Sequence, residues 1–360
     1  MTETALPPLL DELLHACAPS GFEGPAAEVW RRAAGSFAEV GGDAIGSSTA
    51  RVGEGSPTLA VVGHIDEIGL IVTNVDDEGF IWFGPLGYWD PQVLVGQRVR
   101  VLGPGGPVRG VISRKPLHHL LGRDELHVGV RLESLHIDIG AADAEEARGA
   151  VRTGSPIVIE ADPEPVFGSR FVSRCGDDRL GAYVALESLR RCAEGDGPGG
   201  SFVAVASVQE ELGLRGANTT AFEVRPDVAI AVDVTQATDY PGVEEERKRF
   251  GHRPLGSGPA IAVAPTVSNR VSELLIETAE AEGIPYTTRG TGLHNLGLST
   301  ETDADAMQVS RAGIATGVVS IPLRYMHTPV EMFDLRDVEG AVALLAAFGS
   351  RLDSSVEISG

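Results

Sequence analysis

Four stretches of the 360-residue chain are apolar at nearly every position, without the alternation that marks a half-exposed strand. They cover residues 58–63, 202–208, 228–232 and 316–321. A run that is apolar on both faces is typical of a central strand in a parallel sheet, because helices cover such a sheet on both sides. The pattern therefore predicts a buried sheet assembled from segments that lie far apart in the chain.

Helical spacing of apolar residues returns three times in the second half of the chain. One stripe begins at Asp178. Ser268 or Asn269 can cap the next helix, Gly283 stands just past its end, and Asp334 can cap the last one. Helices that alternate with buried strands cover both faces of a parallel-type sheet. The sequence thus predicts an α/β fold with three layers, α/β/α.

The residue composition and the spacing of apolar residues change between residues 68 and 167. Glycine and proline are frequent there, helical spacing is scarce, and the apolar runs are short, as at residues 97–102 and 108–112. Many short strands separated by turn residues are typical of a small β-barrel. We expect residues 68–167 to form a β-barrel domain inserted into a larger domain made of residues 1–67 and 168–360.

Composition narrows the choice of partners and compartment. The chain carries 51 acidic and 29 basic residues, a formal net charge of −22, which argues against nucleic acid or an anionic membrane as a partner. It has no run of 18 apolar residues, and its acidic start does not have the pattern of a signal peptide. Three cysteines without close pairing suit a reducing compartment. We expect a cytoplasmic protein with no membrane partner.

Ionisable residues follow each of the apolar runs. They are His64, Asp66, Glu210, Glu211, Asp233 and, after a short turn, His327, joined by Asp177 and Asp178 at the start of a helix. Each has an ordinary structural explanation when taken alone: a hydrogen-bonded core histidine, a helix cap or a solvated loop. Parallel strands, however, end along one edge of the sheet, so these segments converge on one crevice.

Several carboxylates in one crevice would repel one another and raise each other's pKa. One or two divalent cations remove this conflict, and mixed histidine and carboxylate ligands suit zinc, cobalt or manganese. Asp66 follows His64 by two residues, on the same face of a strand. It can therefore accept a hydrogen bond from the second ring nitrogen of His64 and fix its tautomer. The pattern predicts a metal-dependent catalytic site.

Five short motifs, in the order in which they occur along the chain, resemble those of a known family. They are His-Ile-Asp-Glu-Ile-Gly at 64–69, Asp-Asp-Arg-Leu-Gly at 177–181, Gln-Glu-Glu-Leu-Gly-Leu-Arg-Gly-Ala at 209–217, Asp-Val-Thr at 233–235 and Arg-Tyr-Met-His at 324–327. The chain resembles the dinuclear metallo-aminopeptidases that assemble into tetrahedral dodecamers. Members include glutamyl, leucyl and deblocking aminopeptidases, and some proteins described as cellulases. The likeness covers nearly the whole chain and implies peptide substrates, two divalent metal ions per subunit and a homo-oligomer, the dodecamer among its forms.

The resemblance also implies a ligand set for the two ions. Asp177 matches the carboxylate that bridges both metals. His64 and Asp233 match the residues that complete the protein ligands of one ion, and Glu211 and His327 match those of the other.

Two further residues match catalytic positions of the family. Glu210 matches the general base, and Asp66 matches the partner of His64. Spacing alone leaves open whether Asp177 or Asp178 bridges the ions. The family pattern keeps its first acidic residue and varies the second, which favours Asp177.

The expected activity is hydrolysis of the N-terminal peptide bond of short peptides. A water that bridges two divalent ions has a lowered pKa and is nucleophilic near neutral pH. Glu210 can take its proton and deliver it to the leaving amine. Coordination of the free α-amine to a metal, or its contact with a carboxylate, restricts cleavage to the chain end.

One departure from the family and three rival functions stay open. Thr300 and Glu301 stand where the family carries two glycines, and their bulk and charge suggest a basic or neutral first residue, or reduced activity. The rivals are a glycosidase, whose chemistry also uses two carboxylates, an N-acyl amino acid deacylase, and a catalytically weak scaffold of the same fold.

Three other residues are weaker candidates for metal ligands. His118 and His119 are adjacent, so in a strand they point apart and cannot readily share a metal. Cys175 lies two residues before Asp177 and is a conceivable ligand, although a small buried apolar role suits it better.

Overall fold

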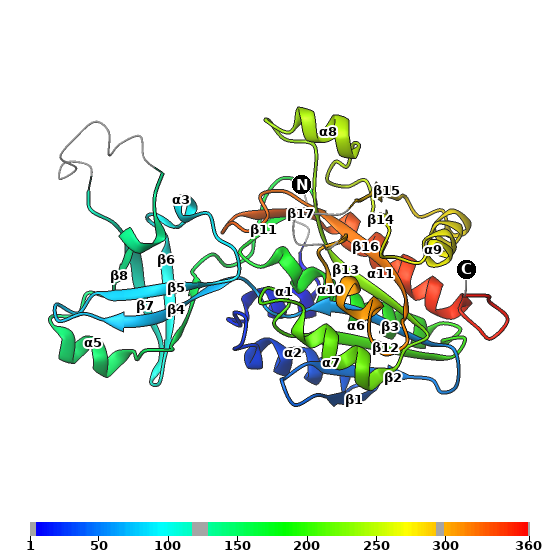
Figure 1. The fold of residues 1–360 in the computed structure, drawn as a ribbon, viewed down its shortest axis with the longest axis horizontal. Coiled ribbons are helices and arrows are strands. Elements are labelled where there is room, and N and C mark those ends of the chain that lie inside the picture. Colours follow the sequence, from blue (N-terminus) through cyan, green and yellow to red (C-terminus); the bar gives the residue numbers. More distant parts are fainter. Residues whose placement is uncertain (1–4, 117–128, 293–298, 359–360) are drawn as a thin grey trace.

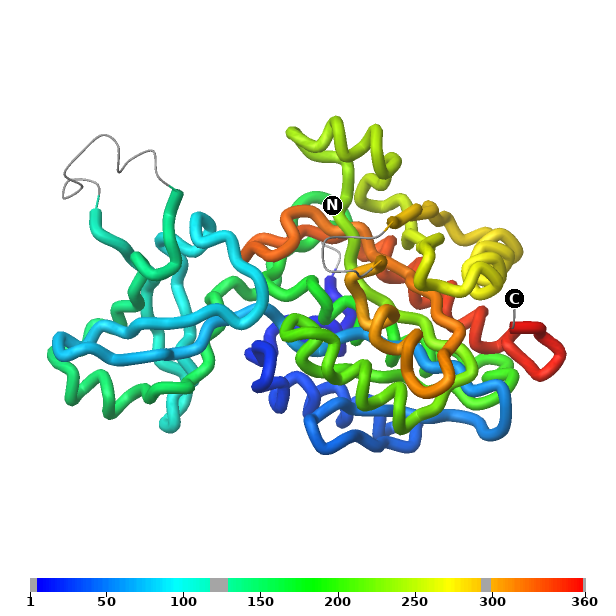
Figure 2. Tube along the Cα trace, in the orientation of Figure 1, coloured from blue at the N-terminus to red at the C-terminus, as the bar shows by residue number. Residues whose placement is uncertain are grey.

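The computed structural model describes residues 5–116, 129–292 and 299–358. In Figure 1, a small barrel stands to one side of a larger part in which helices surround a broad sheet. Figure 2 shows that the chain begins in the larger part, crosses to the barrel in the cyan segment, and returns to the larger part for the second half of the sequence. The barrel is therefore an insertion in the larger α/β part, as predicted.

The helices and strands have the following bounds. The helices are α1 (Pro8–His15), α2 (Gly24–Ala34), α3 (Pro91–Leu94), α5 (Ala144–Ala150), α6 (Gly176–Glu194), α7 (Arg215–Val224), α8 (Glu244–Phe250), α9 (Asn269–Glu282), α10 (Asp303–Gln308) and α11 (Leu335–Arg351). The strands of the large sheet are β1 (Glu39–Gly42), β2 (Ser48–Val52), β3 (Thr58–His64), β12 (Ser201–Ser207), β13 (Val228–Gln236), β14 (Ala260–Val263), β15 (Thr287–Gly290) and β16 (Ala315–Leu323). The barrel strands are β4 (Gly69–Val75), β5 (Ile81–Leu86), β6 (Arg98–Gly103), β7 (Gly106–Ser113), β8 (His136–Asp138) and β9 (Pro156–Ile159). A third, small sheet contains β10 (Glu164–Pro165), β11 (Arg170–Ser173) and β17 (Glu331–Asp334).

The large sheet has the strand order β1-β2-β12-β3-β13-β16-β14-β15. Its four central strands, β12, β3, β13 and β16, are the four predicted apolar runs, and each pairs with its neighbour in parallel. Toward its edges the sheet is mixed, since β2 runs antiparallel to β12 and β14 runs antiparallel to β16. β1 and β2 are joined by a short turn and also pair antiparallel, as a hairpin requires.

Helices cover both faces of this sheet and confirm the three-layer prediction. Val61 of β3 and Ala204 of β12 share one hydrophobic core with α6 and α11. Val62 of β3 and Val205 of β12 point the other way and pack with α7 and α10. Successive residues of a strand face opposite sides, so a run that is apolar throughout fills both cores.

The predicted helix ends are largely confirmed. The side chain of Ser268 accepts a hydrogen bond from the N–H of Val271, and Gly283 ends α9 in the left-handed conformation. The side chain of Asp334 accepts from the N–H of Arg336 and caps α11. Among the described residues no helix has both the length and the apolar composition to cross a bilayer.

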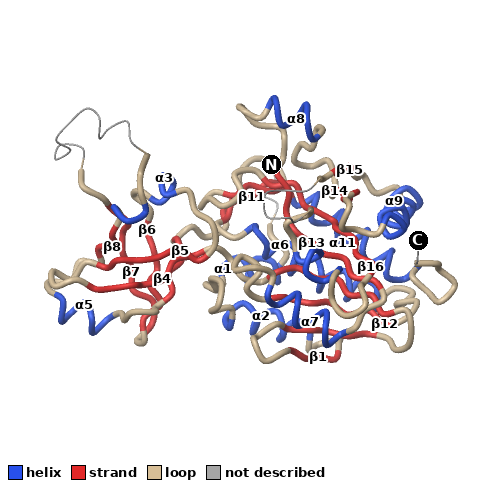
Figure 3. Tube along the Cα trace, in the orientation of Figure 1, coloured by secondary structure: helices blue, strands red, loops and turns tan. Residues whose placement is uncertain are grey.

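The insert is a closed barrel with the strand order β4-β5-β8-β7-β6-β9. Figure 3 shows how its short strands contrast with the helix-rich larger part. Its interior is a separate hydrophobic cluster that includes Leu70, Ile81, Val99 and Ile157. The predicted barrel is thus confirmed, whereas the domain limits at residues 67 and 168 stay a prediction.

Candidate active site

The carboxyl ends of the central strands bring the predicted histidines and carboxylates into one buried cluster. His64 is the last residue of β3, and Asp233 lies near the end of β13. Asp177 lies at the start of α6, where the backbone departs from helical geometry. Its Oδ1 is 3.1 Å from Nε2 of His64, and its Oδ2 is 3.4 Å from Nε2 of His327. The two oxygens of one carboxylate therefore face two different histidines.

Further carboxylates flank each histidine. Oε1 of Glu211 lies 3.3 Å from Nε2 of His327. On the other side, ligand atoms of His64, Asp178 and Asp233 all lie within 4.8 Å of one another. The same holds for the atoms of Asp177, Glu211 and His327, and for those of His64, Glu210 and Glu211. This chemistry and spacing of nitrogen and oxygen atoms fit divalent cations such as zinc, cobalt or manganese.

Asp177 and Asp178 differ in what their side chains contact. Oδ2 of Asp178 accepts a hydrogen bond from the backbone N–H of His64, and Oδ1 accepts from the N–H of Gly181. Asp178 thus holds the end of β3 against the start of α6. The carboxylate of Asp177 instead contacts the two histidine rings.

Asp66 is fully buried and contacts three of the other predicted residues. Its Oδ1 lies 3.4 Å from Nδ1 of His64 and accepts a hydrogen bond from the N–H of Glu210 at 3.1 Å. Its Oδ2 accepts from the N–H of Glu211 and from the hydroxyl of Ser20. The strand expected through residue 66 ends at His64, so it is the turn after β3 that brings Asp66 back toward the imidazole.

Burial makes the free carboxylates of this cluster difficult to ionise together. Burial, and then the charge of Asp177, raise the pKa of Asp233 to about 8. Burial, opposed by His64 and reinforced by Asp233, raises the pKa of Glu210 well above its usual range. Burial lowers the pKa of His327, but Asp177 and Glu211 outweigh it and raise that pKa to about 11. The cluster thus has more acidic groups than its two histidines can neutralise, which is the electrostatic condition for binding cations.

Glu331 is a residue of this site that the sequence did not single out. It is fully buried in β17. Its Oε2 accepts a hydrogen bond from the N–H of Asp177 at 3.0 Å, and its Oε1 accepts from the N–H of His327 at 2.9 Å. The sequence does show a glutamate four residues after His327. It does not show that β17 pairs with β11, the strand that precedes Asp177, and this pairing is what brings Glu331 to the site.

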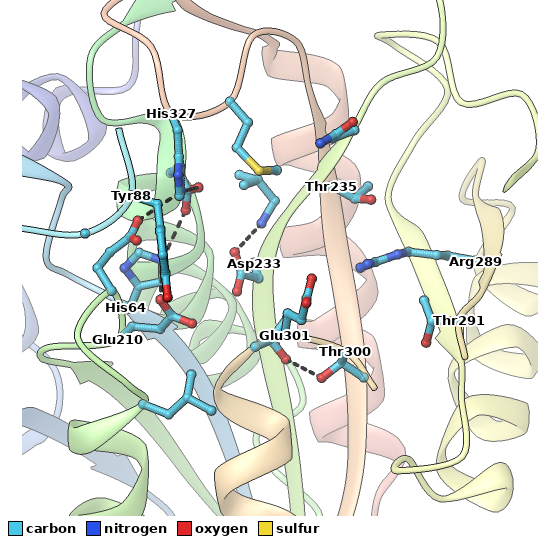
Figure 4. A pocket seen from close by; sticks show the side chains of 18 of the residues that line it. His64, Tyr88, Glu210, Asp233, Thr235, Arg289, Thr291, Thr300, Glu301 and His327 are labelled. Carbon is cyan, nitrogen blue, oxygen red and sulfur yellow. Dashed lines mark hydrogen bonds and ion pairs between the residues drawn. The ribbon is translucent and has the colours of Figure 1, made fainter. Parts of the chain in front are cut away.

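A cavity of about 810 Å³ opens beside the cluster. Figure 4 shows His64, Glu210 and His327 at one end of it, Asp233 and Glu301 in the middle and Arg289 at the other end. Tyr88, from the barrel segment after β5, also lines it and is 73% exposed. Thr300 and Glu301 also border the cavity.

Gly87 lets the barrel segment approach the cluster. A Cβ at this position would lie 2.5 Å from Cγ2 of Ile68 and 3.2 Å from Oε2 of Glu211, and the backbone has φ +81°. Only glycine adopts this conformation without strain.

The weaker candidates do not join the cluster. The thiol of Cys175 contacts the carbonyl oxygen of Leu14, and burial raises its pKa to about 12, so it stays protonated. His118 and His119 lie outside the described residues.

Comparisons with known proteins agree with the fold. A family model described as M42 glutamyl aminopeptidase matches residues 46–344. The lysyl aminopeptidase of Pyrococcus furiosus is 34% identical over 319 residues, which cover 86% of this chain and 86% of that protein. A TET aminopeptidase from Thaumarchaeota archaeon SCGC AB-539-E09 is 35% identical, with a TM-score of 0.89, and the match covers 96% of this chain and 97% of that protein. The TET1 peptidase of Pyrococcus horikoshii is 31% identical, with a TM-score of 0.83, and the match covers 96% of this chain and 99% of that protein. That peptidase can assemble into a tetrahedron or a large octahedral shell.

Fold, site and relatives together define a metallopeptidase of the aminopeptidase type. The chain belongs to the M42 glutamyl aminopeptidase family. The family resemblance inferred from the five motifs is thereby confirmed.

Proposed function

We propose that the chain is an aminopeptidase that works with two divalent ions held by the buried cluster. Asp177 would contact both ions. His64 and Asp233 would complete the ligands of one ion, and Glu211 and His327 those of the other. The observation that supports this is the position of Asp177, whose two oxygens face the two histidines. Each histidine also has a second carboxylate beside it, Asp233 for His64 and Glu211 for His327.

When bound, two divalent ions supply Lewis acidity that lowers the pKa of a shared water and polarises the scissile carbonyl. In this proposal Glu210 would move the proton. Its side chain is 12% exposed, more than Glu211 or Asp177, and its Oε2 stays 3.9 Å from the nearest histidine nitrogen. Its raised pKa suits a group that accepts a proton and later returns it to the leaving amine. Asp66 would hold the ring of His64 in place.

The substrates proposed are short peptides with a free N-terminus, cleaved in the cytoplasm as a late step of protein turnover. The three cysteines, Cys17, Cys175 and Cys192, are all free thiols, in keeping with that compartment. We further propose that the chain assembles into a homo-oligomer of the tetrahedral, dodecameric type, as its TET relatives suggest.

A substrate panel tests this function against its rivals. The protein loaded in turn with zinc, cobalt and manganese is given aminoacyl p-nitroanilides, N-acetylated versions of the same compounds and a soluble cellulose derivative. Cleavage of the free-amine compounds alone, abolished by a chelator and restored by metal, supports the proposal. Cleavage of the acylated compounds would favour a deacylase, sugar release a glycosidase, and no turnover of any compound a scaffold.

A further inference from the structure

A buried glutamate outside the proposed ligand set contacts the turn that carries Glu210 and Glu211. It is Glu23, which stands immediately before α2 and is 5% exposed. Its Oε1 accepts a hydrogen bond from the N–H of Gln209 at 3.2 Å and another from the N–H of Gly21 at 2.6 Å. The start of this turn is thereby joined to a segment 186 residues earlier in the chain.

Three successive backbone N–H groups of this turn donate to buried carboxylates. The N–H of Gln209 donates to Glu23, whereas those of Glu210 and Glu211 donate to Asp66. Gln209 has a left-handed backbone, with φ 55°, which residues other than glycine seldom adopt. Two carboxylate side chains therefore hold the backbone from which the side chain of Glu210 projects.

The stability of α2 does not explain this arrangement. A side-chain oxygen at the position just before a helix often caps that helix. Within the described part of the chain, the side chain of Glu23 makes no such hydrogen bond with α2. Burial, and then the charge of Asp66, raise the pKa of Glu23 to about 7, so burying these two carboxylates close together costs free energy. Such a cost is typical of residues whose contacts serve the geometry of a site.

We propose that Glu23 is a positioning residue for Glu210, the proposed general base. This inference rests on the proposed aminopeptidase function, and it adds a residue to the machinery of that site. Because Glu23 holds the N–H of Gln209, it fixes the backbone just before Glu210 and so the point from which the Glu210 carboxylate reaches the reacting atoms. A displacement of about 1 Å at such a group can cost about a hundredfold in rate.

Two variants of Glu23 separate the reach of its side chain from its charge. Glutamine keeps the length and one acceptor oxygen, and since both hydrogen bonds go to the same oxygen, it can accept both. Aspartate keeps the charge but is one methylene shorter, which draws its oxygens back from Gln209. We expect kcat in Glu23→Asp to fall about tenfold to a hundredfold with KM within about threefold, and kcat in Glu23→Gln to stay within about threefold of the wild type. Glu28→Asp, on the exposed face of α2, is the matched control and should behave like the wild type.

Hydrogen exchange of the metal-free protein gives a second readout that does not depend on activity. We expect faster deuterium uptake across residues 209–211 in Glu23→Asp, and uptake like that of the wild type in Glu23→Gln and Glu28→Asp. Unchanged uptake in Glu23→Asp rejects the positioning role even if no compound is turned over. Faster uptake in a protein whose wild type turns over no compound would leave Glu23 as the residue that holds the turn and count against the aminopeptidase proposal alone.

Other kinetic outcomes would overturn the role of Glu23 without touching the aminopeptidase proposal. Equal kcat in Glu23→Gln and Glu23→Asp would show that the reach to Gln209 does not matter, and a loss in Glu23→Gln alone would assign the effect to the charge. A raised KM with unchanged kcat would place the effect in substrate binding. Elemental analysis should find as much metal in both variants as in the wild type, and a loss of metal in Glu23→Asp would assign the effect to Glu211 in place of Glu210.

Discussion

The carboxylate of Glu331 accepts a hydrogen bond from the backbone N–H of His327 at 2.9 Å, while its other oxygen accepts one from the N–H of Asp177 at 3.0 Å. One buried side chain thus ties together the backbones of two residues that come from different elements. Because His327 has a left-handed backbone, with φ 59°, this contact helps to hold the turn in a conformation that non-glycine residues seldom adopt. Glu331 is therefore a positioning residue for the proposed metal ligands.

Replacement of Glu331 by glutamine tests that role. The amide group has one acceptor oxygen, so one of the two N–H groups would face an NH₂ group and lose its acceptor. We expect weaker metal binding, measured by titration calorimetry, and a fall in kcat of about tenfold to a hundredfold with little change in KM. Glu339→Gln, on the exposed face of α11, is the control. Unchanged metal affinity with a normal melting temperature would contradict the positioning role.

The sequence predicts most of what depends on local pattern. The four central strands, the capped helices α9 and α11 and the inserted barrel follow from apolar periodicity and turn residues. The convergence of His64, Asp177 and Glu211 follows because parallel strands end at one edge of a sheet. The contact of Glu331 does not follow, since it depends on the pairing of β17 with β11, two strands about 160 residues apart.

Glu210→Gln tests the proposed general base. Glutamine has nearly the same shape but cannot accept a proton at neutral pH, so turnover should fall by about a hundredfold to ten-thousandfold. The metals should remain bound, because Glu210 is not among the proposed ligands. Elemental analysis of the purified variant measures the metal, and the residual kcat measures the proton transfer. Loss of both metals together with activity would instead make Glu210 a ligand.

Metal uptake should release protons and grow stronger as the pH rises. In the metal-free protein, burial and the charge of Asp177 raise the pKa of Asp233 to about 8, and the neighbouring carboxylates raise that of His327 to about 11 in spite of its burial. Both groups therefore hold a proton at neutral pH that a cation must displace. Calorimetric titrations in two buffers of different ionisation enthalpy, between about pH 6 and about pH 9, measure the released protons. An enthalpy that does not depend on the buffer would contradict this prediction.

The same pKa shifts give the sign of the stability change with pH. Both folded-state pKa values lie above the ordinary values, 3.8 for Asp233 and 6.5 for His327, so at these two groups the folded protein binds more protons than the unfolded chain. The contribution of Asp233 is complete below about pH 4 and is lost as the pH rises through about 8. That of His327 is complete below about pH 6.5 and is lost through about pH 11. Thermal melts of chelator-treated protein should thus show a melting temperature that falls from neutral to alkaline pH, and added metal should reduce the fall.

Gly87→Ala should damage the site from the side of the barrel. The new Cβ would lie 2.5 Å from Cγ2 of Ile68 and 3.2 Å from Oε2 of Glu211, in a backbone conformation that alanine adopts only with strain. We expect a loss of about 1–3 kcal/mol in the free energy of unfolding. Activity should fall by more than the loss of stability explains, because the carboxylate of Glu211 must move. Gly105→Ala is the matched control, since its Cβ would meet nothing within 4 Å. Denaturant melts and kcat measured on both variants decide the matter: if Gly87→Ala behaves like Gly105→Ala, the barrel segment does not constrain Glu211.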